Sequence, residues 1–237
     1  LSTLLVMSLP FLILQAQTVK SQFFKVTIIL LVPFSWHAMI LLGSRAALLA
    51  SLVSLIPLAY VIRSKKVNIA IAFSFLAFLG YQGSLLIDRA TETVDIAIQG
   101  TDEPLNPRLI SWEAGLRLIP EYPVFGAGVQ MFEAAANNHF PGKTPHVAHN
   151  TFINFSANTG ILTGILFLIL VYGAIKKIKL TSHPNFSIDE TDAYAMASSS
   201  ISIAGFFVCS IFLDLIIFEP FYIVLMINLL SSESFQL

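Results

Sequence analysis

Residues 150–175 read NTFINFSANTGILTGILFLILVYGAI, a run of 26 residues without a charged side chain. A helix needs about 20 mostly apolar residues to cross the hydrocarbon core of a bilayer, so this run is long enough. Three lysines, Lys176, Lys177 and Lys179, follow it closely. An apolar run that ends in a basic cluster is typical of a transmembrane helix whose basic end faces the cytoplasm.

The composition of the whole chain is that of a membrane protein. Of its 237 residues, 56% are hydrophobic and 11% are charged, whereas an ordinary soluble domain carries about 25% charged residues. The mean hydropathy is +0.79. The sequence has no basic stripe of the kind that binds nucleic acid, so we expect no nucleic-acid partner. The single cysteine, Cys209, excludes an internal disulfide and a cysteine-based metal site.

Further apolar runs predict about seven membrane spans in a single membrane domain over residues 1–237. The predicted spans cover residues 1–17, 23–43, 46–62, 67–87, 150–175, 193–217 and 220–232. The predicted fold is therefore an all-α, polytopic transmembrane helix bundle. Because the chain starts at Leu1, in apolar sequence and without methionine, we expect a fragment whose upstream helices are missing.

The positive charges set the predicted topology. Three connections, between spans one and two, three and four, and five and six, hold 8 of the 13 Lys and Arg residues. Alternation of the spans places these three connections on one side, which the positive-inside rule makes cytoplasmic. Arg45 and the long segment 88–149 then face the other side of the membrane, which we expect to be the periplasmic side of a bacterial inner membrane.

The segment 88–149 is predicted to be a large extracytoplasmic loop that contains short helices. It holds 8 of the 14 acidic residues and three of the five histidines. Apolar residues at helical spacing predict a helix between Arg108 and Pro120. Loops of this length are usually functional or disordered, so we look for the site here.

Three arginines on this side are candidate anion-binding residues: Arg45, Arg108 and Arg117. A guanidinium can hold a phosphate through two parallel hydrogen bonds. Arg45 stands in a turn between two spans, where it could instead simply extend to lipid headgroups. Arg108 and Arg117 are nine residues apart, on roughly opposite faces of a helix, so at most one is expected to point into a shared site. Either could also be a solvated loop charge.

The histidines at the end of the loop are candidate bases. His146 and His149 are three residues apart, a spacing that could ligate a metal, but no further ligands are evident and we predict no metal site. A neutral imidazole can instead accept a proton from a substrate near neutral pH. Either histidine could also be a loop residue at the interface without a role. For Asp214 and Glu219, near the outer end of the last two spans, we expect an indirect role such as pairing with a loop arginine.

An ordered set of motifs resembles the O-antigen ligase and polymerase superfamily over about residues 25–175. The set comprises Ser44-Arg45, Arg108 with Trp112, Pro123 with Gly126-Ala127-Gly128, and His149-Asn150. The family's closing motif is His, then Asn, Ser or Gln, nine residues, Gly, two residues, and Gly, Thr or Tyr. Here it reads His149-Asn150, residues 151–159, Gly160, Ile161-Leu162 and Thr163, which is a complete match.

The resemblance implies a metal-independent, inverting glycosyltransferase without a cofactor. Its donor would be a glycan on undecaprenyl diphosphate, and its acceptor a lipid A–core sugar or another glycan. By position, Arg45 and Arg108 would hold the diphosphate and His149 would activate the acceptor hydroxyl. We also assign Arg117, His146 and Asn150 to substrate binding.

Two alternatives stay open beside an O-antigen ligase. A polymerase of the same superfamily shares these motifs. A bicarbonate or other solute transporter would instead show inverted repeats or broken helices that meet at the midplane of the membrane, and the sequence shows neither. Gly160 and Gly164 form a small-xxx-small spacing, which we expect to serve close packing of helices.

Overall fold

The computed structural model describes residues 1–62, 65–98, 107–140, 147–182 and 191–233. Every regular element in these ranges is a helix, which confirms the predicted all-α class for the described part of the chain. The chain divides into two compact units. The first comprises residues 1–84, 171–209 and 218–237, and the second residues 85–170 and 210–217.

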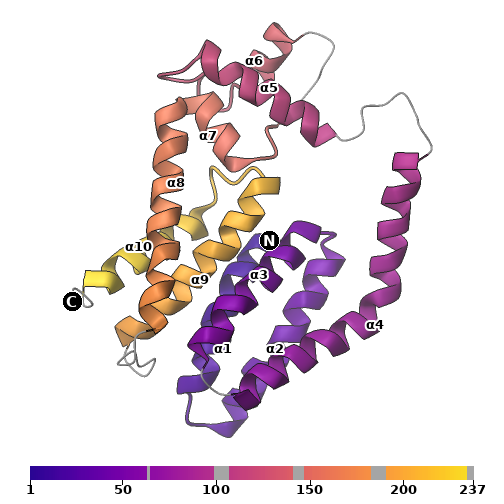
Figure 1. Cartoon of the computed structure of the whole chain (residues 1–237), viewed down its shortest axis with the longest axis vertical. Coiled ribbons are helices and arrows are strands. Elements are labelled where there is room, and N and C mark those ends of the chain that lie inside the picture. Colours follow the sequence, from indigo (N-terminus) through magenta and orange to yellow (C-terminus); the bar gives the residue numbers. More distant parts are fainter. Residues whose placement is uncertain (63–64, 99–106, 141–146, 183–190, 234–237) are drawn as a thin grey trace. The chain divides into compact units, whose positions relative to one another are not determined.

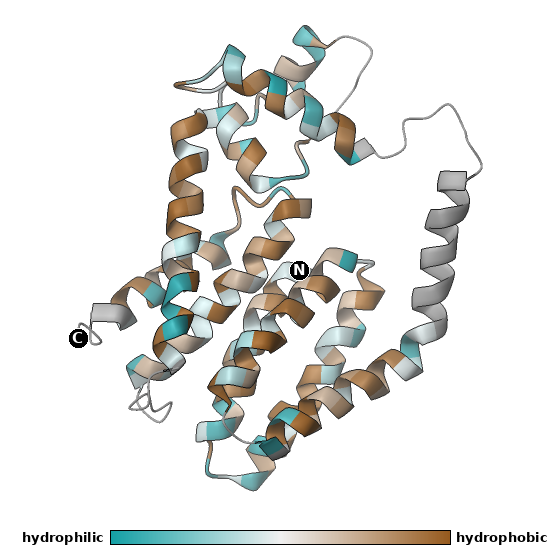
Figure 2. Cartoon of the chain, in the orientation of Figure 1, coloured by the Kyte–Doolittle hydropathy of each residue, from teal (hydrophilic) through white to brown (hydrophobic). Residues whose placement is uncertain are grey.

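The first unit consists of apolar helices (Figure 1). Its elements are α1 (Ser2–Thr18), α2 (Gln22–Leu41), α3 (Arg45–Val61), the start of α4 (Lys65–Ile98), the end of α8 (Ile161–Lys176) with the 3-10 helix η1 (Lys177–Ser182), most of α9 (Thr191–Phe212), and α10 (Glu219–Glu233). Among the described residues of the whole chain, three helical stretches are long and apolar enough to cross a membrane: α2, Ile161–Thr181 and α9. Four further helical stretches are apolar but shorter than a span: α1, α3, Val67–Gly83 of α4 and Glu219–Ser231 of α10. Hydrophobic residues dominate α2 and α8 in Figure 2.

Small residues allow α9 to pack at the centre of the first unit. Of its apolar window 67% is buried, against 28% for α2. A Cβ on Gly205 would lie 2.6 Å from Ser54 Oγ of α3 and 2.8 Å from Val6 Cγ1 of α1, so only glycine permits this approach. The Ser202 hydroxyl donates to the Met7 carbonyl of α1 at 2.5 Å. Close packing of small residues with hydroxyl hydrogen bonds is the usual basis of helix association in membranes.

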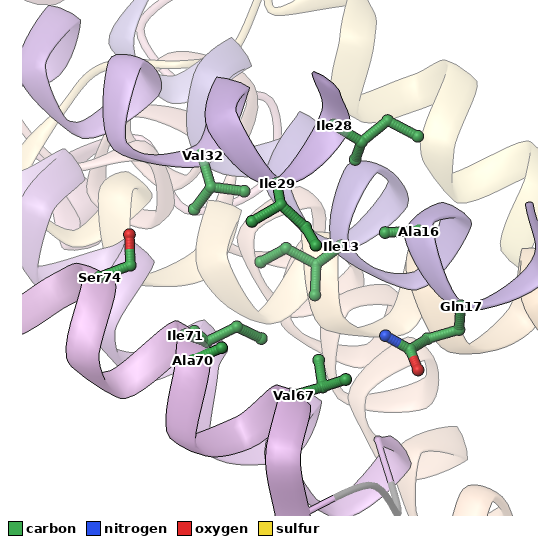
Figure 3. A pocket seen from close by; sticks show the side chains of 10 residues that line it. All are labelled: Ile13, Ala16, Gln17, Ile28, Ile29, Val32, Val67, Ala70, Ile71 and Ser74. Atoms are coloured by element: carbon green, nitrogen blue, oxygen red, sulfur yellow. The ribbon is translucent and has the colours of Figure 1, made fainter. Parts of the chain in front are cut away.

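An apolar pocket of about 160 Å³ also lies in the first unit, between α1, α2 and α4 (Figure 3). It is lined by Ile13, Ala16, Gln17, Ile28, Ile29, Val32, Val67, Ala70, Ile71 and Ser74. Among these lining residues only Gln17 and Ser74 are polar, and none is ionisable. The pocket therefore offers no acid, base or fixed charge for chemistry.

The second unit contains the end of α4, α5 (Pro107–Glu121), α6 (Phe132–His139), α7 (Thr151–Thr159) and the start of α8. Figure 1 shows α5 and α6 next to α7, and these three helices share a small apolar core. The buried members of this core are Ala114, Leu118, Phe132, Ala135, Ala136, Ala148, Ile153 and Ala157. The described helices of the predicted loop, α5 and α6, therefore pack on a core that they share with α7. The helix α5 coincides with the helix predicted between Arg108 and Pro120.

The helices differ from the predicted spans at three places. The helix α4 continues to Ile98, beyond the predicted end at residue 87, and α9 ends at Phe212 instead of residue 217. The run 150–175 forms two helices, α7 and α8, separated at Gly160. Gly160 has φ 96° and ψ 156°, a conformation outside the helical region that is essentially restricted to glycine. Its role is therefore to break the helix, while Gly164 allows close contact with Ser156 and Phe152 of α7.

Candidate functional site

The start of α5 places Arg108 and Trp112 on one helical face. The helix begins at Pro107, which suits this position because the first N–H of a helix has no intrahelical partner. Arg108 and Trp112 are four residues apart and are therefore neighbours on the helix surface. The Trp112 indole N–H donates to the His149 carbonyl oxygen at 3.3 Å. This bond connects the face that carries Arg108 to the backbone of His149.

His149 has an unusual backbone conformation. Its φ is 50°, in the left-handed region that few residues other than glycine adopt readily. Histidine is among the residue types that are found there more often than most. The next residue, Asn150, is extended and caps α7, because its Oδ1 accepts from the Ile153 N–H at 3.0 Å. Non-glycine residues in such conformations often cluster at functional sites, where the surrounding contacts hold them.

Three hydrogen bonds fasten the residues after His149 to the last turn of α9 and to the segment that follows this helix. The Asn150 Nδ2 donates to the Ile211 carbonyl at 3.1 Å. The Thr151 hydroxyl donates to the Leu213 carbonyl at 2.8 Å and accepts from the Leu215 N–H at 3.1 Å. We call these three bonds the 150–151 clamp. Because its partners flank Asp214, the clamp holds this acid in the neighbourhood of His149.

Two charges act on His149, which is only partly buried. Desolvation by burial lowers the pKa of its imidazole below the ordinary value, and the positive charge of Arg108 lowers it further. The negative charge of Asp214 opposes both effects. His149 is therefore neutral at pH 7 and able to accept a proton, with a cation and an anion close enough to influence it.

Substitution of Thr151 tests the clamp. Thr151→Val keeps the shape of the side chain but removes one donor and leaves the Leu215 N–H without its acceptor. We expect a loss of about 1–3 kcal/mol in stability, the usual consequence of leaving such a group unsatisfied. Thermal unfolding of the purified protein in detergent measures it.

Thr27→Val is the matched control, because the exposed Thr27 hydroxyl donates to the Phe23 carbonyl of its own helix at 3.0 Å and so joins no distant segments. If both variants unfold at the same temperature as the parent chain, the clamp contributes nothing to stability.

The other predicted site residues of the second unit have local partners. Arg117 forms an ion pair with Glu113 at 2.6 Å and lies over the Phe140 ring, 5.6 Å from its centroid. The Asn150 amide is engaged at both ends by the cap and the clamp. His146 lies outside the described residues. Substrate binding by these three residues stays a prediction, and the contacts of Asn150 indicate a positioning role.

Arg45 belongs to the first unit. It is the first residue of α3, and the preceding Ser44 caps this helix by accepting from the Ala47 N–H at 3.3 Å. Gly43, with φ 66°, forms the turn from α2. The Arg45 side chain is exposed at this helix start. Its predicted contact with a diphosphate stays a prediction.

The sequence did not predict that Asp214 lies close enough to His149 to influence the pKa of its imidazole. Its position near the predicted end of a span suggested only an indirect role, such as pairing with a loop arginine. The sequence does mark Asp214 as a candidate, because an acidic residue in or near a membrane span is a functional candidate by default. The 150–151 clamp could not be predicted from the sequence, because it joins residues about 60 positions apart. Among the described residues no group of three or more His, Cys, Asp or Glu is arranged to hold a metal ion.

Comparison with known proteins agrees with the resemblance drawn from the motifs. The family model described as O-Antigen ligase matches residues 29–168, more than half of the chain. The match includes Arg45, α5 and the complete closing motif from His149 to Thr163. A search of curated proteins finds no match. The chain belongs to the O-antigen ligase family.

Proposed function

We propose that this integral membrane protein transfers a glycan from a polyprenyl diphosphate donor to a sugar hydroxyl, with His149 as the base. Membership of the family supports glycosyl transfer in general. The observation that carries the specific proposal is the setting of His149: a neutral imidazole that feels Arg108 on α5 and Asp214 after α9. These are the groups that transfer from a diphosphate requires.

The reaction follows from the chemistry of these groups. His149 takes the proton of the acceptor hydroxyl while the hydroxyl oxygen attacks the anomeric carbon. A new C–O bond forms as the bond between that carbon and the diphosphate oxygen breaks, and polyprenyl diphosphate leaves. Arg108 stabilises the negative charge that grows on the leaving group. Direct attack inverts the anomeric configuration.

Asp214 has a complementary role in this proposal. When His149 accepts the proton, the imidazole becomes a cation beside the Arg108 guanidinium, and two positive charges repel each other. The Asp214 carboxylate offsets this repulsion. We therefore assign Arg108 to the donor and Asp214 to the protonated base. Arg45 is proposed as a second donor-binding arginine.

An assay of glycan transfer in proteoliposomes tests the proposed function. The chain is incubated with a glycan on undecaprenyl diphosphate and, in parallel, with lipid A–core or with a second lipid-linked glycan as acceptor. Product on lipid A–core supports an O-antigen ligase, while lengthened lipid-linked glycan supports a polymerase. If neither acceptor is extended while another member of the family reacts under the same conditions, the proposal for this chain is wrong.

Substitutions of Arg108 and Asp214 are expected to move the pH dependence in opposite directions. Arg108→Gln removes a cation, so the pKa of His149 rises and the acid limb of the kcat/KM profile moves to higher pH. Asp214→Asn removes an anion, so the same limb moves to lower pH. Arg108→Gln should also lower kcat by about 100-fold, the usual effect of removing a group that stabilises transition-state charge.

Arg108→Lys separates the two roles of the arginine. It keeps the positive charge near His149, so the acid limb should stay in place. It loses the planar, two-pronged contact with phosphate, so kcat should still fall. Profiles that move in the same direction for Arg108→Gln and Asp214→Asn would contradict the arrangement of charges described here.

A further inference from the structure

The second unit exposes a cluster of apolar side chains in the turn between α5 and α6. The exposed fractions are 57% for Val124, 86% for Phe125, 68% for Val129 and 47% for Met131. We call residues 124–131 the apolar turn. Single exposed apolar residues are normal on a protein surface, but several large ones in a short turn indicate an interaction site.

The apolar turn is held against the junction of α7 and α8. The N–H of Ala127 donates to the Ala157 carbonyl at 2.8 Å, and the N–H of Gly128 donates to the Asn158 carbonyl at 3.0 Å. From the other side of the junction, the Ile161 N–H donates to the Pro123 carbonyl at 3.0 Å. The turn is therefore attached to the last residues of α7 and to the first residue of α8.

Two glycines make this attachment very close. A Cβ on Gly126 would lie 2.2 Å from the Asn158 carbonyl carbon, and one on Gly160 would lie 2.0 Å from the Val124 oxygen. Neither backbone could approach the other if these residues had side chains. The exposure of Phe125 and its neighbours is thus a consequence of a fixed backbone, which directs the apolar side chains outward.

The attachment point is also the beginning of a candidate membrane span. The stretch Ile161–Thr181 is long and apolar enough to span a bilayer. Its first turns expose Leu162, Ile165, Leu166 and Ile169, which is the surface that a lipid-facing helix requires. The apolar turn adjoins this surface directly, because its base is bonded to Ile161. Its exposed side chains therefore continue the lipid-facing surface to the end of the span.

We propose that the apolar turn inserts into the lipid interface beside the first residues of α8. Phe125, Val129, Val124 and Met131 bury their side chains among lipid headgroups and upper acyl chains, as the apolar face of an interfacial segment does. His149 and the turn lie at opposite ends of α7, which is about 14 Å long for nine residues. The turn thus fixes the second unit to the bilayer by an anchor separate from the site. This inference does not depend on the chemistry of transfer.

Spin labels in proteoliposomes test the proposal. Cys209, which is buried, is first replaced by alanine, and single cysteines are then introduced as Phe125→Cys or Val129→Cys and labelled with a nitroxide. Asn137→Cys on α6 is the matched control, an exposed polar position of the same unit. Collision rates with oxygen, which concentrates in lipid, and with a water-soluble nickel chelate measure the environment of each label.

The expected result is a several-fold higher ratio of oxygen to nickel collisions at positions 125 and 129 than at position 137. Equal ratios at all three positions would place the apolar turn in water and overturn the proposal. Low collision rates with both reagents at 125 and 129 would show that protein covers the turn, either another segment or a second copy, and would also overturn it. Glycan transfer is not measured, so the outcome is independent of the proposed activity.

Discussion

Replacement of His149 by alanine is expected to lower glycan transfer by about 100- to 10,000-fold, the contribution that a positioned general base usually makes. Burial and the positive charge of Arg108 lower the pKa of this imidazole below its ordinary value, and the charge of Asp214 also acts on it. Without it, the acceptor hydroxyl would have to lose its proton to water as it attacks. The rate of product formation in proteoliposomes, at saturating donor and acceptor, measures the effect.

His139→Ala is the matched control for this prediction. His139 belongs to the same unit, and its Nε2 is hydrogen-bonded to the Tyr122 hydroxyl at 2.8 Å, so it has a structural partner of its own. We expect this variant to keep most of the activity. In the parent chain, kcat/KM should rise with pH through the pKa of His149, which lies below the ordinary value. Full activity of His149→Ala would refute the assignment of the base.

The candidate residues of the site could be named from sequence because they stand in short motifs. The motifs name Arg108 and His149 by position, and in the structure the positive charge of Arg108 lowers the pKa of the His149 imidazole. Their roles in transfer stay a prediction. The order of apolar runs also predicted the helical class. Both predictions rest on local patterns: an apolar run forms a helix in lipid wherever it occurs, and a motif fixes residue types at fixed spacing.

What could not be predicted depends on contacts between distant residues. The sequence does not reveal that Thr151 bonds to Leu213 and Leu215, or that these bonds hold Asp214 near His149. It also gives the run 150–175 the appearance of one helix, since Gly160 inside an apolar run is compatible with tight helix packing. Only the approach of the Val124 carbonyl explains why the chain needs a glycine there and why the helix ends.

The same contact supports the prediction with the largest expected effect on stability, Gly160→Ala. The residue has φ 96° and ψ 156°, a region essentially closed to other residues, at a cost of about 1–3 kcal/mol. The added Cβ would also lie 2.0 Å from the Val124 oxygen, and a backbone atom cannot move aside as a flexible side chain can. Together these effects should destabilise the protein by about 3 kcal/mol or more, in the range that only a few mechanisms reach.

Thermal unfolding in detergent should then show a midpoint lower by roughly 10 °C, since about 1 kcal/mol corresponds to 2–4 °C for a chain of this size. Gly173→Ala on α8 is the control: nothing lies within 4 Å of its Cβ position, and alanine favours a helix over glycine. This variant should unfold at the parent temperature or above it.

A double substitution shows whether the contact between the apolar turn and the α7–α8 junction is the cause. Gly126→Ala meets the Asn158 backbone across the same contact and should be destabilising by itself. If each variant separates the turn from the junction, Gly126→Ala and Gly160→Ala combined should destabilise the protein by less than the sum of the two, because the contact is lost only once. Full additivity would mean that the two glycines relieve independent strains. A Gly160→Ala midpoint equal to that of Gly173→Ala would mean that the turn is not fastened at this junction.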